Sequence, residues 1–155
     1  MPEVKLTEDC MRLISQFESL TGAGSRDCVI DERNGRLIFV VNPGDMGLAI
    51  GKKGASIKKA SEVMGKKIEV VEYNSNPEQF IKNCFLPAQV ISMTFDGEPG
   101  EQTVQVDVRD EDRGIAIGKE GKNIFKAKKL AQRQHNITDV QILQKPVMAE
   151  PADQK

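Results

Sequence analysis

The sequence has 155 residues, a formal net charge of −1 and a hydrophobic share of 39%. No uninterrupted apolar run approaches the roughly 20 residues that span a bilayer, and the N-terminus leads into an acidic, polar segment. We therefore expect neither a membrane partner nor a signal peptide. The three cysteines, Cys10, Cys28 and Cys84, form no CxxC pair and are expected to be buried thiols in a reducing cytoplasm.

The first half of the chain predicts a helix, two strands, two helices and a strand. Asn34-Gly35 between two β-rich runs is a strong hairpin signal, and Gly65 follows the last helix as a C-cap. The predicted segments are a helix over 6–20, strands at about 27–32 and over 37–41, helices over 46–50 and from about 54 to Gly65, and a strand over 67–73.

The second half repeats this order. Asn76-Pro77-Glu78-Gln79 is a good helix start, with an N-cap, a proline at N1 and a glutamine at N3. The predicted segments are a helix over 77–85, strands over 89–95 and 103–108, a short helix before Gly118, a longer helix after it, and a strand over 139–143. We predict domains at 1–73 and 77–143, and a disordered C-terminal tail over 144–155, which has two prolines and no periodicity.

A stretch of sixteen residues occurs twice. Residues 45–60 recur as residues 112–127, with ten identities at a constant offset of 67. Each copy contains a glycine-bounded loop with lysine, Gly51-Lys52-Lys53-Gly54 and Gly118-Lys119-Glu120-Gly121. Such a loop can bring backbone N–H groups and an ammonium close to a phosphate, because glycine has no side chain to hold the partner away. A plain helix–helix turn is the simpler alternative, but it does not require lysine at the same place twice.

Positive charge is concentrated around these two loops. Residues 45–67 have a net charge of +4 and residues 112–135 a net charge of +5, so the rest of the chain sums to −10. Local potential decides where a polyanion binds, more than net charge does. The helix after each loop adds further lysines, Lys58 and Lys59 in the first copy and Lys122 and Lys126 in the second. The alternative is that these lysines form an ordinary solvated helix face.

The pattern Ile-Gly-x-x-Gly-x-x-Ile between two helices, inside an α-β-β-α-α-β order, resembles the KH domain of type II. The resemblance covers residues 5–73 and 77–143. It implies an α+β fold with two tandem KH domains, each a three-stranded sheet with helices packed on one face. It also implies that the GXXG loops hold the backbone of single-stranded RNA while isoleucines border a groove for the bases. The expected RNA-binding residues are Ile50, Gly51, Lys52, Lys53, Gly54, Ile57, Lys58 and Lys59, with Ile117, Gly118, Lys119, Glu120, Gly121, Lys122, Ile124 and Lys126.

The pair with almost no linker resembles the KH pair of the NusA family of transcription factors. Because the sequence begins directly in the first KH helix, it is most similar to the short archaeal members. The resemblance implies an RNA-binding elongation or termination factor, with RNA polymerase as a further candidate partner, and we expect a monomer. The alternative is a protein-interaction module that docks on a polymerase or ribonucleoprotein with one or neither loop holding RNA. Glu120 in the second loop keeps that alternative open.

Catalysis is not expected. His135 is the only histidine, so a histidine-dependent triad or metal site is not available, and no cofactor motif occurs. Asp45 and Asp112 each precede a short helix and are predicted to be N-caps. Gly22-Ala23-Gly24 does not extend to a dinucleotide-binding motif.

Overall fold

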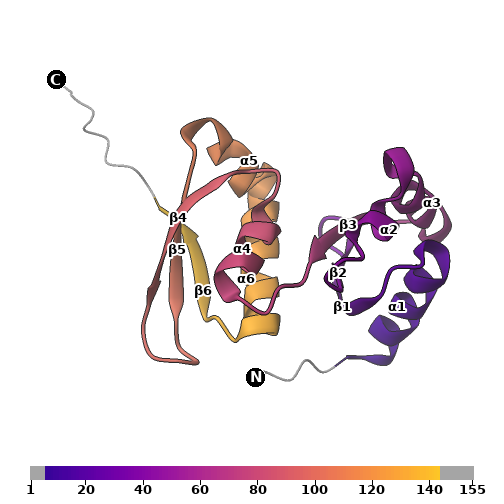
Figure 1. The fold of residues 1–155 in the computed structure, drawn as a ribbon, viewed down its shortest axis with the longest axis horizontal. Coiled ribbons are helices and arrows are strands. Elements are labelled where there is room, and N and C mark those ends of the chain that lie inside the picture. Colours follow the sequence, from indigo (N-terminus) through magenta and orange to yellow (C-terminus); the bar gives the residue numbers. More distant parts are fainter. Residues whose placement is uncertain (1–5, 144–155) are drawn as a thin grey trace. The chain divides into compact units, whose positions relative to one another are not determined.

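The computed structural model describes residues 6–143, so the predicted tail over 144–155 lies outside the described residues. The chain divides into two compact units between Cys84 and Phe85 (Figure 1). We call α1 to β3 the first module and α4 to β6 the second module, so that each contains one copy of the repeated order of elements. The α+β class predicted from the sequence is confirmed, while the exact domain boundaries stay a prediction.

The first module contains one sheet in the order β1-β2-β3. Strand β2 pairs antiparallel with β1 and parallel with β3. The elements are α1 (Glu8–Thr21), β1 (Ser25–Asp31), β2 (Arg36–Val41), α2 (Met46–Ile50), a 3₁₀ turn η1 (Lys52–Gly54), α3 (Ala55–Met64) and β3 (Lys67–Glu72). The parallel pairing requires a crossover, and α2 and α3 provide it.

The second module repeats this plan, with a sheet in the order β4-β5-β6 and the same antiparallel and parallel pairings. The elements are α4 (Pro77–Phe85), β4 (Val90–Asp96), β5 (Thr103–Val108), the 3₁₀ turn η2 (Asp110–Asp112), α5 (Arg113–Ile117), the 3₁₀ turn η3 (Lys119–Gly121), α6 (Lys122–His135) and β6 (Asp139–Ile142). Each predicted helix and strand is therefore present, with ends that move by one or two residues.

Helices cover one face of the first sheet because alternate residues of β2 are apolar on that side. Leu37, Phe39 and Val41 are buried in one cluster with residues of α1 and α3. The ring of Phe17 stacks on that of Phe39, with centroids 4.1 Å apart. This packing fixes the position of α3, and with it the loop that precedes α3.

The helix ends follow the predicted capping chemistry in two places. Gly65 is left-handed, with φ of 72°, and its N–H donates to the Ser61 carbonyl at the end of α3. The Asn76 side chain accepts a hydrogen bond from the Glu78 N–H at the start of α4. Asn83 of α4 then donates to the Glu72 carbonyl, which ties α4 to the end of β3.

The prediction that the side chains of Asp45 and Asp112 cap the short helices is wrong, because neither side chain makes a capping hydrogen bond. Asp45 has φ of −99° and ψ of 1°, far from the extended backbone that aims a cap side chain at the first helical turn. Its carboxylate accepts instead from the Gly24 N–H, at 2.8 Å. Asp112 accepts in the same way from the Gln89 N–H, at 2.8 Å. Each aspartate thus ties the start of its module's first strand to the start of its short helix.

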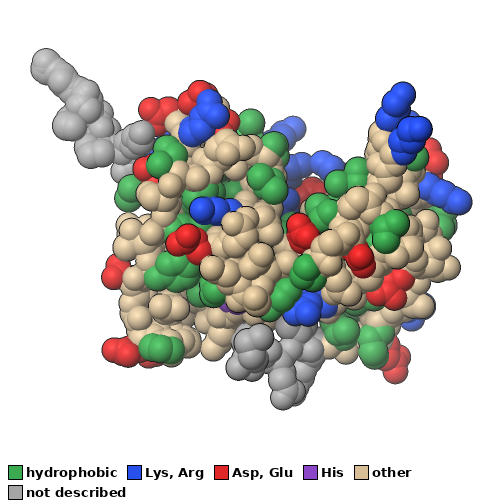
Figure 2. Space-filling view, viewed as in Figure 1, with side chains coloured by type: hydrophobic (Ala, Val, Ile, Leu, Met, Phe, Trp, Pro, Cys, Tyr) green, Lys and Arg blue, Asp and Glu red, His purple; other side chains and the backbone are tan. Residues whose placement is uncertain are grey.

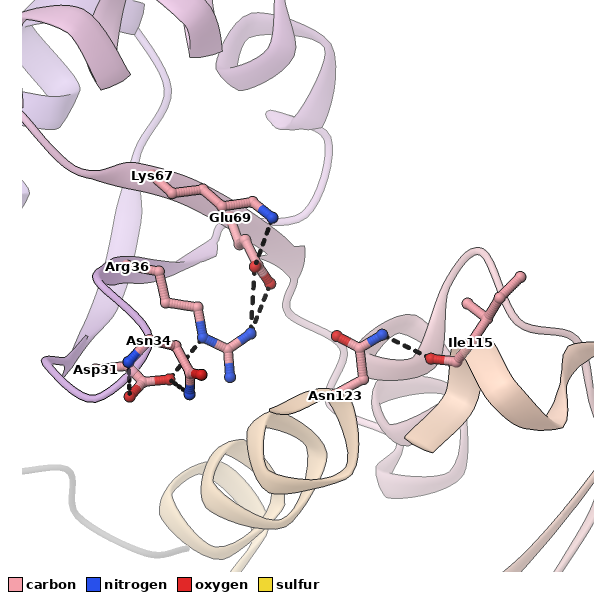
Figure 3. A network of polar contacts seen from close by, with 7 residues as sticks. All are labelled: Asp31, Asn34, Arg36, Lys67, Glu69, Ile115 and Asn123. Atoms are coloured by element: carbon pink, nitrogen blue, oxygen red, sulfur yellow. Dashed lines mark hydrogen bonds and ion pairs between the residues drawn. The ribbon is translucent and has the colours of Figure 1, made fainter. Parts of the chain in front are cut away.

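A buried ion-pair network joins the three strands of the first module (Figure 3). The side chain of Arg36 is fully buried and contacts Asp31 at 2.7 Å and Glu69 at 3.1 Å. Asn34 also donates to Asp31 from the hairpin turn. Burial alone would raise the pKa of Asp31, but the hydrogen bonds from Asn34 and Arg36 outweigh it and lower the pKa below 3.8.

We predict that Asp31→Asn lowers the free energy of unfolding by about 3 kcal/mol at pH 7. This value is at the lower end of the range for breaking a buried ion pair, because Arg36 still pairs with Glu69 in the variant. A carboxyl whose pKa is lowered by folding stabilises the fold above its unfolded pKa and loses that contribution as pH falls. Urea unfolding should therefore show a difference from wild type that shrinks below about pH 4.

Asp9→Asn is the matched control, because Asp9 pairs with Arg12 on the exposed side of α1 and such pairs contribute little. Equal losses in the two variants, or a loss independent of pH, would contradict the assigned role of Asp31.

Candidate nucleic-acid interface

The two glycine loops have the same backbone conformation. Gly51 has φ of 78° and ψ of 173°, and Gly118 has φ of 79° and ψ of 166°. Two residues on, Lys53 and Glu120 share a left-handed conformation with φ of 56°. L-residues other than glycine, asparagine and aspartate rarely adopt this region, which costs about 1–2 kcal/mol. A shared strained residue indicates that the surrounding structure imposes the loop shape in both copies.

Glycine is required at the start of each loop by a close approach of two backbone segments. A Cβ on Gly51 would lie 2.7 Å from the Ser56 nitrogen, and one on Gly118 would lie 2.8 Å from the Asn123 nitrogen. In the second module the Asn123 side chain also donates to the Ile115 carbonyl (Figure 3). The loop is thus held against the first turn of the following helix, whose N–H groups favour an anion.

Lysines of the first loop extend into solvent. Lys52 and Lys53 are exposed, and Figure 2 shows positive side chains gathered at the tip that Figure 1 locates between α2 and α3. Lys58 and Lys59 are also exposed on α3. The predicted cations of the first copy are therefore all accessible from solvent.

The second loop differs in charge and exposure. Lys119 and Glu120 are exposed, and Lys122 is half-buried. Lys126 is buried, at 8% exposure, so it does not extend into solvent as the lysines of α3 do. Its predicted contact with RNA stays a prediction.

The four predicted isoleucines differ in exposure and in packing. Ile50 and Ile117 end the short helices and are 38% and 41% exposed, which is high for isoleucine. Ile57 is half-buried and packs against the core of the first module. Ile124 lines a hollow of about 370 Å³ between α6 and β6. An apolar surface therefore lies beside each GXXG loop.

Three polar residues of that hollow were missed by sequence reasoning. Lys128, Gln105 and Gln141 line it together with Ile124. Lys128 lies four residues after Ile124, so the two share one face of α6, and this spacing could have revealed the lysine. The glutamines could not have been found before the strand register was known.

Residues 6–143 lack two other features, a helix that could span a membrane and a cluster of three or more metal-ligating side chains. None of the described helices is long and apolar enough to cross a membrane. Within the same range, no group of three or more histidine, cysteine or acidic side chains could hold a metal ion.

Comparison with known proteins assigns both modules. Residues 13–75 match the model of the KH domain, and residues 77–145 match that of the NusA-like second KH domain. A probable transcription termination protein NusA of Methanococcus vannielii is 39% identical over 88% of this chain and 78% of its own length. The chain belongs to the NusA-like family of tandem KH proteins.

Other NusA-like relatives match over nearly their full length. The protein of the same description from Halococcus morrhuae is 34% identical, over 90% of this chain and 98% of its own. The chain in the crystal structure of APE1850 has 40% sequence identity to this chain. The two superpose with a TM-score of 0.80, over 89% of this chain and all of the APE1850 chain. The family resemblance read from the repeated motif is confirmed.

We predict that Gly51→Ala destabilises the first module by about 1–3 kcal/mol, because the new Cβ meets the Ser56 backbone at a positive φ. Gly47→Ala is the control. Gly47 lies in α2 with no atom near its ideal Cβ, so alanine there should be neutral or stabilising by up to about 1 kcal/mol. Thermal unfolding measures both, and a Gly51 variant as stable as the Gly47 variant would show that the close approach is not required.

Proposed function

We propose that this NusA-like protein is a single-stranded RNA-binding transcription factor that holds the RNA backbone with its two GXXG loops. The observation that carries the proposal is the shared loop conformation, with a lysine next to the first glycine in each copy. The names of the relatives, probable transcription termination proteins, support a role in transcription elongation or termination.

Phosphate binding follows from what the loop presents. Glycine at both ends leaves the backbone accessible, and Lys52 and Lys53 add two ammonium groups. The first turn of α3 contributes N–H groups and the positive end of its dipole. A phosphate at the loop would therefore meet hydrogen-bond donors from the backbone and charge from the side chains.

Single-stranded RNA suits the apolar surface beside each loop better than a duplex does. Unstacked bases can enter a groove bordered by Ile50 or Ile124, while paired bases remain inside a helix. The only tyrosine, Tyr73, is 6% exposed and its ring lies under Arg26, whereas Phe125 near the start of α6 is 46% exposed and offers a base an apolar ring face. Base recognition would then depend on apolar contact and hydrogen bonds.

The short connection between the modules favours joint binding of one strand. Only four residues separate β3 from α4. Two sites joined so closely gain from a high effective concentration. At about four nucleotides per GXXG module, we expect RNAs of about eight to ten nucleotides to bind much better than tetramers.

We predict that Lys52→Asp with Lys53→Asp weakens binding of a single-stranded decamer by at least about tenfold, because each lysine that meets a phosphate releases counterions. Fluorescence anisotropy at several salt concentrations should also give a shallower salt dependence for the variant. Duplex RNA of the same length should bind wild type much more weakly than the single strand.

The control variant is Arg33→Asp with Lys66→Asp, which makes the same change in charge at two exposed sites, the hairpin turn and the far end of α3. Equal losses of RNA affinity in the two double variants would mean that the change in net charge, and not the position of the loop lysines, causes the weaker binding. Equal affinity for duplex and single-stranded RNA would contradict the proposal that unstacked bases enter a groove beside each loop.

The second loop is predicted to bind phosphate less strongly than the first. Glu120 has the same backbone conformation as Lys53, so a carboxylate stands where the first loop has an ammonium. We expect Glu120→Lys to raise RNA affinity about fivefold at low salt, from a charge interaction of about 1 kcal/mol. Glu111→Lys on the exposed turn before α5 is the control. An unchanged affinity for Glu120→Lys would mean that the second loop does not meet phosphate.

A protein-docking role for the second module is the competing function, and Glu120 is the observation that favours it. Crosslinking in cells separates the two, because RNA contacts in both modules and enrichment of nascent transcripts are expected for the proposed function. Crosslinks confined to the first module would favour docking by the second.

A further inference from the structure

Strand β4 is an edge strand of the second module, and none of its side chains is buried. The sheet order is β4-β5-β6, so within residues 6–143 the outer edge of β4 has no neighbouring strand. Figure 1 shows α6 on one side of this sheet. An edge strand presents a row of backbone N–H and C=O groups that can pair with another chain.

The matching strand of the first module is protected against such pairing. β1 carries charged side chains at Arg26, Asp27 and Asp31, and five of its seven residues are buried. β4 has one charged residue, Asp96 at its end, and contains neither lysine nor proline. Lysine, proline, inward-pointing charge and bulges are the usual means by which edge strands avoid pairing. A bulge at its start is the one such feature of β4, and the pairing with β5 is regular after it.

The two faces of β4 differ in chemistry. Met93 and Phe95 lie on the core side with the buried valines of β5, and both are only half-buried. Thr94 and Asp96 lie on the opposite, exposed side. The side chains of an added strand would alternate between the same two sides. Its apolar side chains would cover Met93 and Phe95, and the residues between them would face the exposed side.

The exposed side of this edge is acidic. Residues 90–108 contain no lysine or arginine and have a net charge of −4, from Asp96, Glu98, Glu101 and Asp107. The first three are exposed at the end of β4 and in the hairpin that follows it. This local charge disfavours RNA and anionic lipid and favours a basic partner.

Asp107 provides a carboxylate within reach of an added strand. It lies on the exposed side of β5, since its neighbours Val106 and Val108 are buried in the core. Its Oδ1 is buried and has no hydrogen-bond partner among the described residues, which is a costly state that a cation would relieve. An added strand would run about 10 Å from β5, which is two strand spacings. A lysine or arginine can cross β4 at this point, because the residue opposite Asp107 is the small Ser92.

We propose that β4 binds an extended basic segment of a partner protein, which adds a strand to the sheet of the second module. The segment would alternate apolar residues on the core side with lysine or arginine facing Asp96 and Asp107. Strand addition gains affinity from main-chain hydrogen bonds and specificity from alternate side chains. Residues 144–155 do not fit this description, because they have no net charge and contain two prolines. The inference does not require RNA in either module.

The test adds a seven-residue peptide that alternates lysine and valine to the isotope-labelled full chain. At saturation, hydrogen exchange within residues 90–96 should slow by at least about tenfold, because new hydrogen bonds protect the outward N–H groups. Asp96→Lys with Glu98→Lys should weaken peptide binding by at least about tenfold. The control Glu32→Lys with Glu62→Lys makes the same change in charge at two exposed sites of the first module. It should stay within about twofold of wild type, because distant surface charges are screened.

The inference is wrong if the peptide does not bind, or if the protected amides lie outside the second sheet. It is also wrong if a peptide with proline in place of each valine binds as tightly, because charge alone would then explain the binding. A wild type that sediments as a dimer, with β4 amides protected before peptide is added, would assign this edge to a second copy and overturn the inference. None of these results would bear on RNA binding by the loops, which the decamer measurements test separately.

Discussion

The close approach of each loop glycine to the following helix is the constraint on which the candidate interface depends. Gly51 and Gly118 lie so near the first turn of α3 and α6 that no Cβ fits between the two backbones. This contact turns the chain sharply after the short helix and imposes the left-handed residue two positions later. In each module the start of the following helix and an exposed lysine of the loop therefore lie within a few residues of one another. The chemistry of the site follows from a steric requirement of the backbone.

The two modules share this backbone and differ in the side chains placed on it. The first loop carries two lysines, and the second replaces one of them with Glu120. The first sheet holds a buried arginine between two carboxylates, whereas Thr103 stands at the position of Arg36 in the second. The second groove holds Lys128 and Gln141, whose counterparts in the first are engaged otherwise.

Local signals predicted most of the fold. Asn34-Gly35, Gly65 and the Asn76-Pro77 helix start each act over a few residues, and all three are found in their predicted roles. Tertiary contacts were beyond such reasoning. Asp45 and Asp112 have the sequence positions of N-caps, but their carboxylates accept hydrogen bonds from Gly24 and Gln89, which lie more than twenty residues earlier, just before β1 and β4. The sequence likewise counts Lys126 among the lysines of the helix after the second loop, and only the packing of α6 shows that its side chain is buried.

The central claim is that both GXXG loops contact the RNA backbone. The most direct measurement is an amide chemical-shift titration of the isotope-labelled protein with a single-stranded decamer. The account predicts the largest shifts at the N–H groups of residues 51–56 and 118–123, where the loops meet the helix starts. Large shifts elsewhere, with both loops unchanged at saturation, would contradict it.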